Sequence, residues 1–91
     1  MISHTTEKFR KLFAKLPKEI RLKARESYSQ FHEDPYYPSL NFKKVHSTKP
    51  VYAVRISKEY RALGMPGDGK ILWFWIGSHS DYDKILKHLR G

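Results

Sequence analysis

The residues best suited to chemistry lie near the end of the chain, in the segment WFWIGSHSDYDKIL over 73–86. A dense apolar run stops at Gly77, and His79 and Tyr82 follow before the next apolar stripe begins. Histidine exchanges protons near neutral pH, and tyrosine offers a hydroxyl. Because functional side chains are often presented where strands end, His79 is a candidate acid or base. The alternatives are that His79 is an ordinary loop residue and that Tyr82 belongs to the apolar stripe.

Two arginines interrupt apolar strand patterns. Arg55 lies in VYAVRIS (51–57) and Arg61 in YRALGM (60–65). A charge in an apolar strand is costly to bury unless it has a partner or reaches solvent. A three-residue connecting loop (57–59) places the two arginines opposite each other on one face, whereas a two-residue turn places them on opposite faces. Two arginines on one face repel each other unless an anion lies between them. The alternative is that each pairs with a carboxylate or extends into solvent.

These residue types suffice to cleave RNA without a metal. A base must take the 2′-hydroxyl proton, cations must stabilise the phosphorane, and an acid must protonate the leaving 5′-oxygen. The sequence permits this chemistry without requiring it. No metal or other cofactor is expected, because the five histidines are scattered and the chain has no cysteine. The glycines of GMPGDGK (64–70) indicate a hairpin turn rather than a phosphate-binding loop.

The net charge of +9 points to a polyanionic partner. Residues 1–50 hold eleven basic and five acidic residues, and residues 51–91 hold seven and four, so no charged tail explains the excess. A basic folded body attracts nucleic acid, although the same charge can serve only solubility. The sequence shows neither a membrane-length apolar stretch nor the apolar core of a signal peptide. We therefore expect a cytoplasmic protein with no membrane association.

The elements that must position these residues fit one domain over 1–91, since so short a chain cannot build two cores. Thr5 or Thr6 can cap a first helix, in which Phe9, Leu12, Phe13 and Leu16 share one face. Pro17 ends this helix and suits the first turn of a second, which the prolines of EDPYYPS (33–39) end. A helical hairpin is predicted.

The second half of the chain changes to strand patterns. They predict a short strand over 40–45, a hairpin of 51–57 and 60–65, a turn at PGDG (66–69) and a central strand over 70–76. Ser80 and Asp83 form a possible capping box for a short C-terminal helix. The predicted fold class is α+β, with an N-terminal helical hairpin packed on a small, mostly antiparallel sheet of three to four strands.

Several segments together resemble a known family. HTTEKFRKLFAKLP (4–17), DPYYPSLNFKKV (34–45), YAVRISKEYRALG (52–64) and ILWFWIGSHSDYDKIL (71–86), in this order, are similar to the RelE/ParE superfamily of toxins from bacterial type II toxin–antitoxin systems. The most specific pieces are YR at 60–61 and the WIGSHSDYDKIL ending. Most members begin with a β-strand, whereas MISHTT (1–6) is too short and polar to predict one.

The resemblance implies two activities on one scaffold. One branch cuts messenger RNA on the ribosome, and the other inhibits DNA gyrase without being an enzyme. In the nuclease branch a basic cleft beside the sheet carries the chemistry. Carried onto this chain, that cleft implies a set of catalytic candidates and a pair of RNA contacts: Arg55, Arg61, His79 and Tyr82, with Lys43 and Lys44.

The leading expectation is a toxin that inhibits translation as a metal-independent, ribosome-dependent mRNA endonuclease. The alternatives are a gyrase inhibitor of the ParE type and an RNA-binding or inactive member. The implied partners are a cognate antitoxin encoded next to the gene and either mRNA on the ribosome or DNA gyrase.

Overall fold

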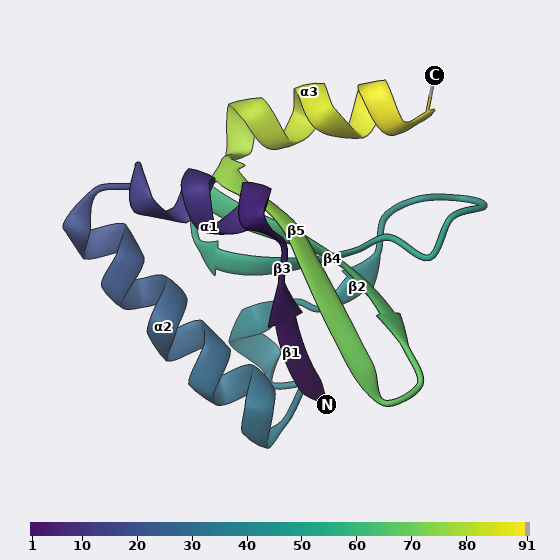
Figure 1. Cartoon of the computed structure of the whole chain (residues 1–91), viewed down its shortest axis with the longest axis horizontal. Helices are drawn as coiled ribbons and strands as arrows, with labels where there is room; N and C mark the ends of the chain where they lie inside the picture. The colour runs from purple at the N-terminus through teal and green to yellow at the C-terminus, as the bar shows by residue number, and fades with distance from the viewer. Residues whose placement is uncertain (91) are drawn as a thin grey trace.

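The computed structural model describes residues 1–90 of the chain. Three α-helices, one short 3₁₀-helix and five strands lie within these residues (Figure 1). In chain order they are β1 (Ile2–Thr5), α1 (Glu7–Ala14), α2 (Lys18–Glu33), η1 (Pro38–Leu40), β2 (Lys43–Lys44), β3 (Tyr52–Ser57), β4 (Tyr60–Gly67), β5 (Lys70–Ser78) and α3 (His79–Arg90).

The strands form one sheet in the order β1-β5-β4-β3-β2. β1 is parallel to β5, and the other neighbouring pairs are antiparallel. Helices α1 and α2 pack on one face of the sheet and α3 packs on the other. The predicted α+β fold is therefore confirmed, with five strands rather than three or four.

The helical hairpin begins and ends as its sequence predicts. Thr6 is the cap of α1, because the Phe9 backbone N–H donates to its Oγ1 at 3.0 Å. Pro17 separates the two helices. Arg21 holds the corner, since its Nη1 donates to the carbonyls of Ala14 and Leu16 at the end of α1. The prediction of this hairpin is confirmed.

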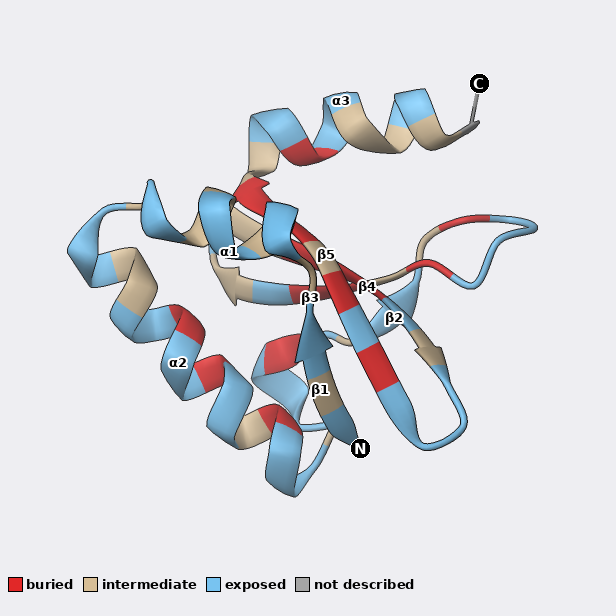
Figure 2. Cartoon of the chain, viewed as in Figure 1, coloured by how far each residue is buried: buried red, intermediate tan, exposed pale blue. Residues whose placement is uncertain are grey.

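One hydrophobic core lies between the hairpin and the sheet. Its buried members come from α2, η1 and the three long strands, which Figure 2 shows as red bands: Ala24, Phe31, Leu40, Val54, Ala62, Ile71, Trp73 and Ile76. The rings of Phe31 and Trp73 meet edge to face at 5.2 Å. Burial of such rings supplies much of the stability of a small domain.

The second core lies between the sheet and α3. It contains Val51, Ala53, Leu63, Trp75 and Tyr82, with the apolar stripe of α3 packed around them. The far end of α3 is fixed by His46, which is buried within the segment between β2 and β3. The His46 Nδ1 accepts from the backbone N–H groups of Thr48 and Lys49, and its Nε2 lies 3.0 Å from the Leu89 carbonyl oxygen. This geometry requires the tautomer with hydrogen on Nε2.

The first strand was missed from the sequence. β1 pairs with β5 along Ile2–Thr5, and the Thr6 N–H donates to the Trp73 carbonyl at 3.0 Å. The Trp73 indole N–H donates to Ser3 Oγ at 3.1 Å, so the polar side chains of MISHTT help to attach the strand. β1 is an edge strand that is mostly exposed, which explains its polar composition.

Three predicted boundaries also differ from the structure. The strand expected over 40–45 is reduced to Lys43–Lys44, because residues Pro38–Leu40 form η1 and Asn41 has a positive φ of 45°. β4 continues to Gly67, and Asp68 and Gly69, with φ of 52° and 74°, make a tight hairpin turn. α3 begins at His79, and Ser78 rather than Ser80 caps it: the Asp81 N–H donates to Ser78 Oγ at 3.2 Å.

None of the helices within residues 1–90 is both long enough and apolar enough to cross a membrane.

Candidate functional site

The candidate residues gather at one end of the sheet, around the turn between β3 and β4. Arg55 on β3 is in register with Arg61 on β4, and Arg61 is in register with Gly77 on β5. The turn itself has only two residues, since Ser57 pairs with Tyr60. A bulge between Arg55 and Ser57 restores the register in which the two arginines share a face. The arrangement expected from a three-residue loop is thus reached with a shorter turn.

Arg61 binds the backbone of this turn. Its Nη1 donates to the carbonyl oxygens of Ser57 at 2.6 Å, Tyr60 at 2.9 Å and Lys58 at 3.2 Å. The side chain is half-buried, and none of the carboxylates in residues 1–90 lies within ion-pair distance of it. Three carbonyls around one nitrogen fix the guanidinium in place, while its planar fork has further N–H donors on Nε and Nη2. Arg61 therefore stabilises the turn and can also present donors to an anion.

His79 is the first residue of α3 and joins the same turn. Its backbone N–H donates to the Glu59 carbonyl at 2.7 Å, so β5 delivers the residue directly against the β3–β4 hairpin. The imidazole is 43% exposed, and its Nδ1 lies 3.4 Å from Asp83 Oδ2, one helical turn further on. A carboxylate at Nδ1 favours hydrogen on that nitrogen and leaves Nε2 for a substrate.

Tyr82 has the environment of a core residue. It is 8% exposed and packs with Trp75, whose ring centroid lies 6.4 Å away. Its ring also meets the His79 imidazole edge to face at 5.6 Å. Tyr82 thus packs against His79. This geometry favours the interpretation of Tyr82 as part of the apolar stripe.

The remaining candidates are exposed cations on the outer strands. Lys43 is in register with Ala53 and Lys44 with Tyr52, so successive side chains point to opposite faces of the sheet. Lys43 consequently shares a face with Arg55 and Arg61, while Lys44 does not. The structure brings Arg55, Arg61 and His79 together, with Lys43 further along the same face.

A polar groove of about 460 Å³ opens on the outer side of Arg55. α2 forms one wall and the unpaired end of β3 forms the other. Lys23, Glu26 and Gln30 line it from α2, and Lys58 lines it from the turn. Sequence reasoning missed this groove because its residues are far apart in the chain.

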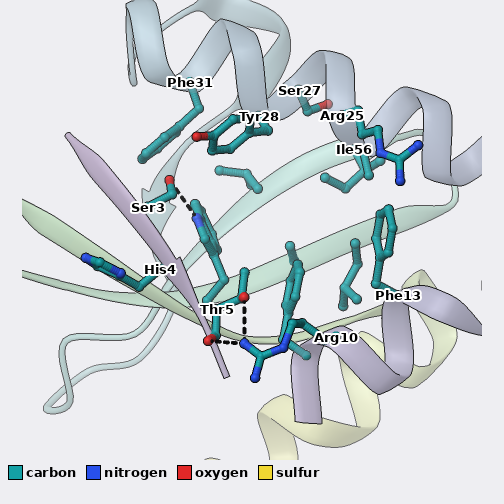
Figure 3. A pocket seen from close by; sticks show the side chains of 16 residues that line it. Ser3, His4, Thr5, Arg10, Phe13, Arg25, Ser27, Tyr28, Phe31 and Ile56 are labelled. Carbon is teal, nitrogen blue, oxygen red and sulfur yellow. Dashed lines mark hydrogen bonds between the residues drawn. The ribbon is translucent and has the colours of Figure 1, made fainter. Parts of the chain in front are cut away.

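A second, apolar groove of about 750 Å³ lies between the hairpin, β1 and the sheet. Aromatic rings of Phe13, Phe31 and Tyr28 line it, and Figure 3 shows Arg10 and Arg25 at its margin. Arg10 is held by Thr5, whose carbonyl and Oγ1 accept from its Nη1, and Arg25 lies over the Phe13 ring at 5.5 Å. The groove suits a partner with apolar side chains flanked by carboxylates.

Comparison with known proteins agrees with this architecture. Residues 18–84 match the model of the ParE-like toxin domain. Three solved toxin structures have similar folds: RelE in the RelB–RelE antitoxin–toxin complex of Methanococcus jannaschii (TM-score 0.71, 18% identity, 88% of this chain and 95% of that chain covered), YafQ from E. coli strain BL21(DE3) (0.72, 10%, 88% and 94%) and the YoeB/ParE toxin from Agrobacterium tumefaciens (0.69, 13%, 87% and 99%). No curated protein sequence matches the chain. At these identities the structures establish a shared fold.

Proposed function

Because the chain belongs to the ParE-like toxin family, within the RelE/ParE superfamily of toxin–antitoxin toxins, we propose that it inhibits translation by cutting mRNA on the ribosome. The observation that carries this proposal is the position of His79. An exposed imidazole, with a carboxylate near Nδ1, stands at the same turn as Arg55 and Arg61. A proton carrier beside two cations matches what metal-independent cleavage of a phosphodiester needs.

In the proposed reaction the 2′-hydroxyl of the RNA attacks the adjacent phosphorus, and the bond from phosphorus to the 5′-oxygen breaks. Arg61, through its Nε and Nη2 donors, and Arg55 stabilise the charge that develops on the phosphoryl oxygens. His79 exchanges one proton through Nε2, as base at the 2′-hydroxyl or as acid at the leaving 5′-oxygen, and water makes the other proton transfer, so that the products are a 2′,3′-cyclic phosphate and a 5′-hydroxyl. Lys43, which lies on the same face of the sheet, contacts a flanking phosphate.

The proposal is tested by primer extension on mRNA bound to translating ribosomes, with the purified chain added. We expect new 5′ ends of the mRNA within the ribosome-covered region, and no comparable cleavage of the same RNA without ribosomes. An EDTA-treated protein sample should cut equally well, since the proposed chemistry uses no metal. If the mRNA stays intact on both stalled and translating ribosomes, the nuclease assignment is contradicted.

A second candidate is inhibition of DNA gyrase, which the match to the ParE-like domain model favours. Under this reading Arg55, Arg61 and His79 form a contact surface and no bond is cleaved. A gyrase supercoiling assay run beside the primer extension separates the two activities. Inhibited supercoiling with intact mRNA would replace the nuclease by the gyrase inhibitor.

We propose that the partner is an antitoxin encoded by the neighbouring gene. Several similar structures are antitoxin–toxin complexes. The apolar groove suits an antitoxin segment with apolar and acidic side chains, because Arg10 and Arg25 flank its aromatic floor.

Co-expression with the neighbouring gene should rescue growth and yield a stable complex. Arg25→Glu should weaken that complex about 10-fold in pull-down or calorimetry, since it places a carboxylate where the partner has one. Lys70→Glu, at the opposite end of the sheet, is the matched control and should bind as the wild type does. A chain that is harmless alone and copurifies with nothing would argue for the RNA-binding or inactive reading.

A further inference from the structure

We propose that the polar groove between α2 and the outer end of β3 binds the RNA backbone beside the scissile phosphate. The groove is lined by three cations, Lys23 from α2 and Arg55 and Lys58 from the β3–β4 hairpin. This inference rests on the proposed function, because it names a second contact for the same RNA substrate.

The cations of the groove have no partner that would neutralise them. Among residues 1–90, the contacts between basic and acidic side chains are Lys11 with Glu7 and His79 with Asp83, and neither involves a cation of the groove. Lys23, Arg55 and Lys58 are all exposed, so their charges face the solvent of the groove. One carboxylate, Glu26, also lines it and leaves a net charge of +2 from three cations and one acid. Such a surface attracts phosphate groups.

The groove is connected to the candidate cleavage site through the β3–β4 hairpin. Arg55 lines the groove and is also in register with Arg61. Arg61 in turn donates to the carbonyls of Ser57 and Lys58, two residues that line the groove. A strand of RNA whose phosphate lies at Arg61 can therefore continue past Arg55 into the groove without leaving the protein surface.

The lining favours RNA over a protein segment. Apart from Ile56, the residues around the groove are charged or carry hydroxyl or amide groups, as Gln30 and three serines do. An antitoxin segment gains most of its affinity from apolar contacts, and the apolar groove on the far side of α2 offers those. A sugar–phosphate backbone needs cations and hydrogen-bond donors, which this groove supplies.

The test measures binding of a fluorescein-labelled 12-nucleotide RNA with 2′-O-methyl sugars, which lacks the attacking hydroxyl and stays intact. Fluorescence anisotropy with the full chain gives Kd over a range of salt concentrations. Lys23→Ala and Lys58→Ala should each weaken binding about 3-fold, as loss of an exposed ion pair does. The double variant should weaken it about 10-fold and lower the salt dependence by about 0.7 for each lost phosphate contact.

Glu26→Gln is expected to have the opposite effect on RNA binding. Misfolding of a variant would not produce tighter binding, so this variant separates the two causes. Removing this carboxylate should tighten RNA binding about 2-fold, because it repels phosphate from inside the groove. Lys70→Ala, which removes an exposed lysine at the far end of β5, is the matched control and should leave Kd unchanged. Circular dichroism of each variant checks the fold.

The proposal is overturned if Lys23→Ala and Lys58→Ala bind RNA like Lys70→Ala, if the wild type does not bind the RNA, or if Glu26→Gln weakens binding. It is also overturned if these variants lose affinity for the antitoxin instead of the RNA. The proposal for the groove and the proposal of nuclease activity can be contradicted separately. Cleavage on the ribosome without groove-dependent RNA binding contradicts only the proposal for the groove. Groove-dependent RNA binding without cleavage contradicts only the proposal of nuclease activity.

Discussion

His79→Ala should lower the rate of ribosome-dependent mRNA cleavage by about 10²–10⁴-fold, the usual effect of losing general acid–base assistance. The imidazole is 43% exposed and contributes little packing, so the variant should remain folded. Single-turnover primer extension on programmed ribosomes measures the rate. His88→Ala is the matched control, because His88 is an exposed histidine of the same helix. Equal rates for His79→Ala and the wild type would remove His79 from the reaction.

Arg61 needs a graded comparison because its side chain has a structural role as well. Arg61→Ala removes both the donors to a phosphate and the bonds to the Ser57, Lys58 and Tyr60 carbonyls. The variant should therefore lose activity and also some stability of the turn, by about 1–3 kcal/mol. Arg61→Lys keeps the charge but cannot reproduce the planar fork. Arg61→Ala is tested at a temperature below its own unfolding transition. If it unfolds at a lower temperature than the wild type but cleaves mRNA at the wild-type rate while folded, Arg61 only stabilises the turn.

Tyr82→Phe completes the comparison at the same site. Tyr82 is packed between His79 and Trp75, and the phenylalanine ring fills the same volume. The structural reading predicts cleavage within a few-fold of the wild type. A loss that approaches that of His79→Ala would show that the hydroxyl takes part in the reaction.

Local patterns in the sequence predicted the elements whose apolar residues recur at fixed spacing. The hairpin of α1 and α2 and the buried strand β5 were predicted because helix and strand periodicities are local signals. β1 gives no such signal. Its pairing partner lies almost 70 residues later in the chain, from Lys70 to Trp73, and its own side chains are mostly exposed. Only tertiary contacts show that Ile2–Thr5 form a strand.

The sequence indicates the individual residues of the candidate site but not their arrangement in space. The sequence proposes Arg55, Arg61 and His79 as candidates, yet the face shared by the two arginines depends on a bulge, which residue types alone do not indicate. The contact of His79 with Asp83 has an i, i+4 spacing, whereas the sequence pattern indicates a capping role for Asp83. The groove beside Lys23 had no sequence signal, because it arises where α2 passes the end of β3.

The second large effect expected concerns the first core, in which Trp73 contacts elements from three parts of the chain. Trp73 is 6% exposed, its ring meets Phe31 of α2, and its indole N–H donates to Ser3 of β1. Trp75 of the same strand is 7% exposed, so both tryptophans of the central strand predicted over 70–76 are buried. Gly64 packs so closely that an added Cβ would lie 2.7 Å from Trp73 Cε3.

Trp73→Ala should therefore lower the free energy of unfolding by about 3–5 kcal/mol, because it removes a large buried ring and leaves a cavity. Urea unfolding followed by circular dichroism measures this change. Ser3→Ala, which removes only the partner of the indole N–H, should cost about 1 kcal/mol, and Trp73→Phe should fall between the two. Since a domain of this size is stabilised by roughly 5–15 kcal/mol, the alanine variant should lose much of its margin. A cost for Trp73→Ala no larger than that of Ser3→Ala would mean that the indole ring does not hold β1 and α2 to the sheet.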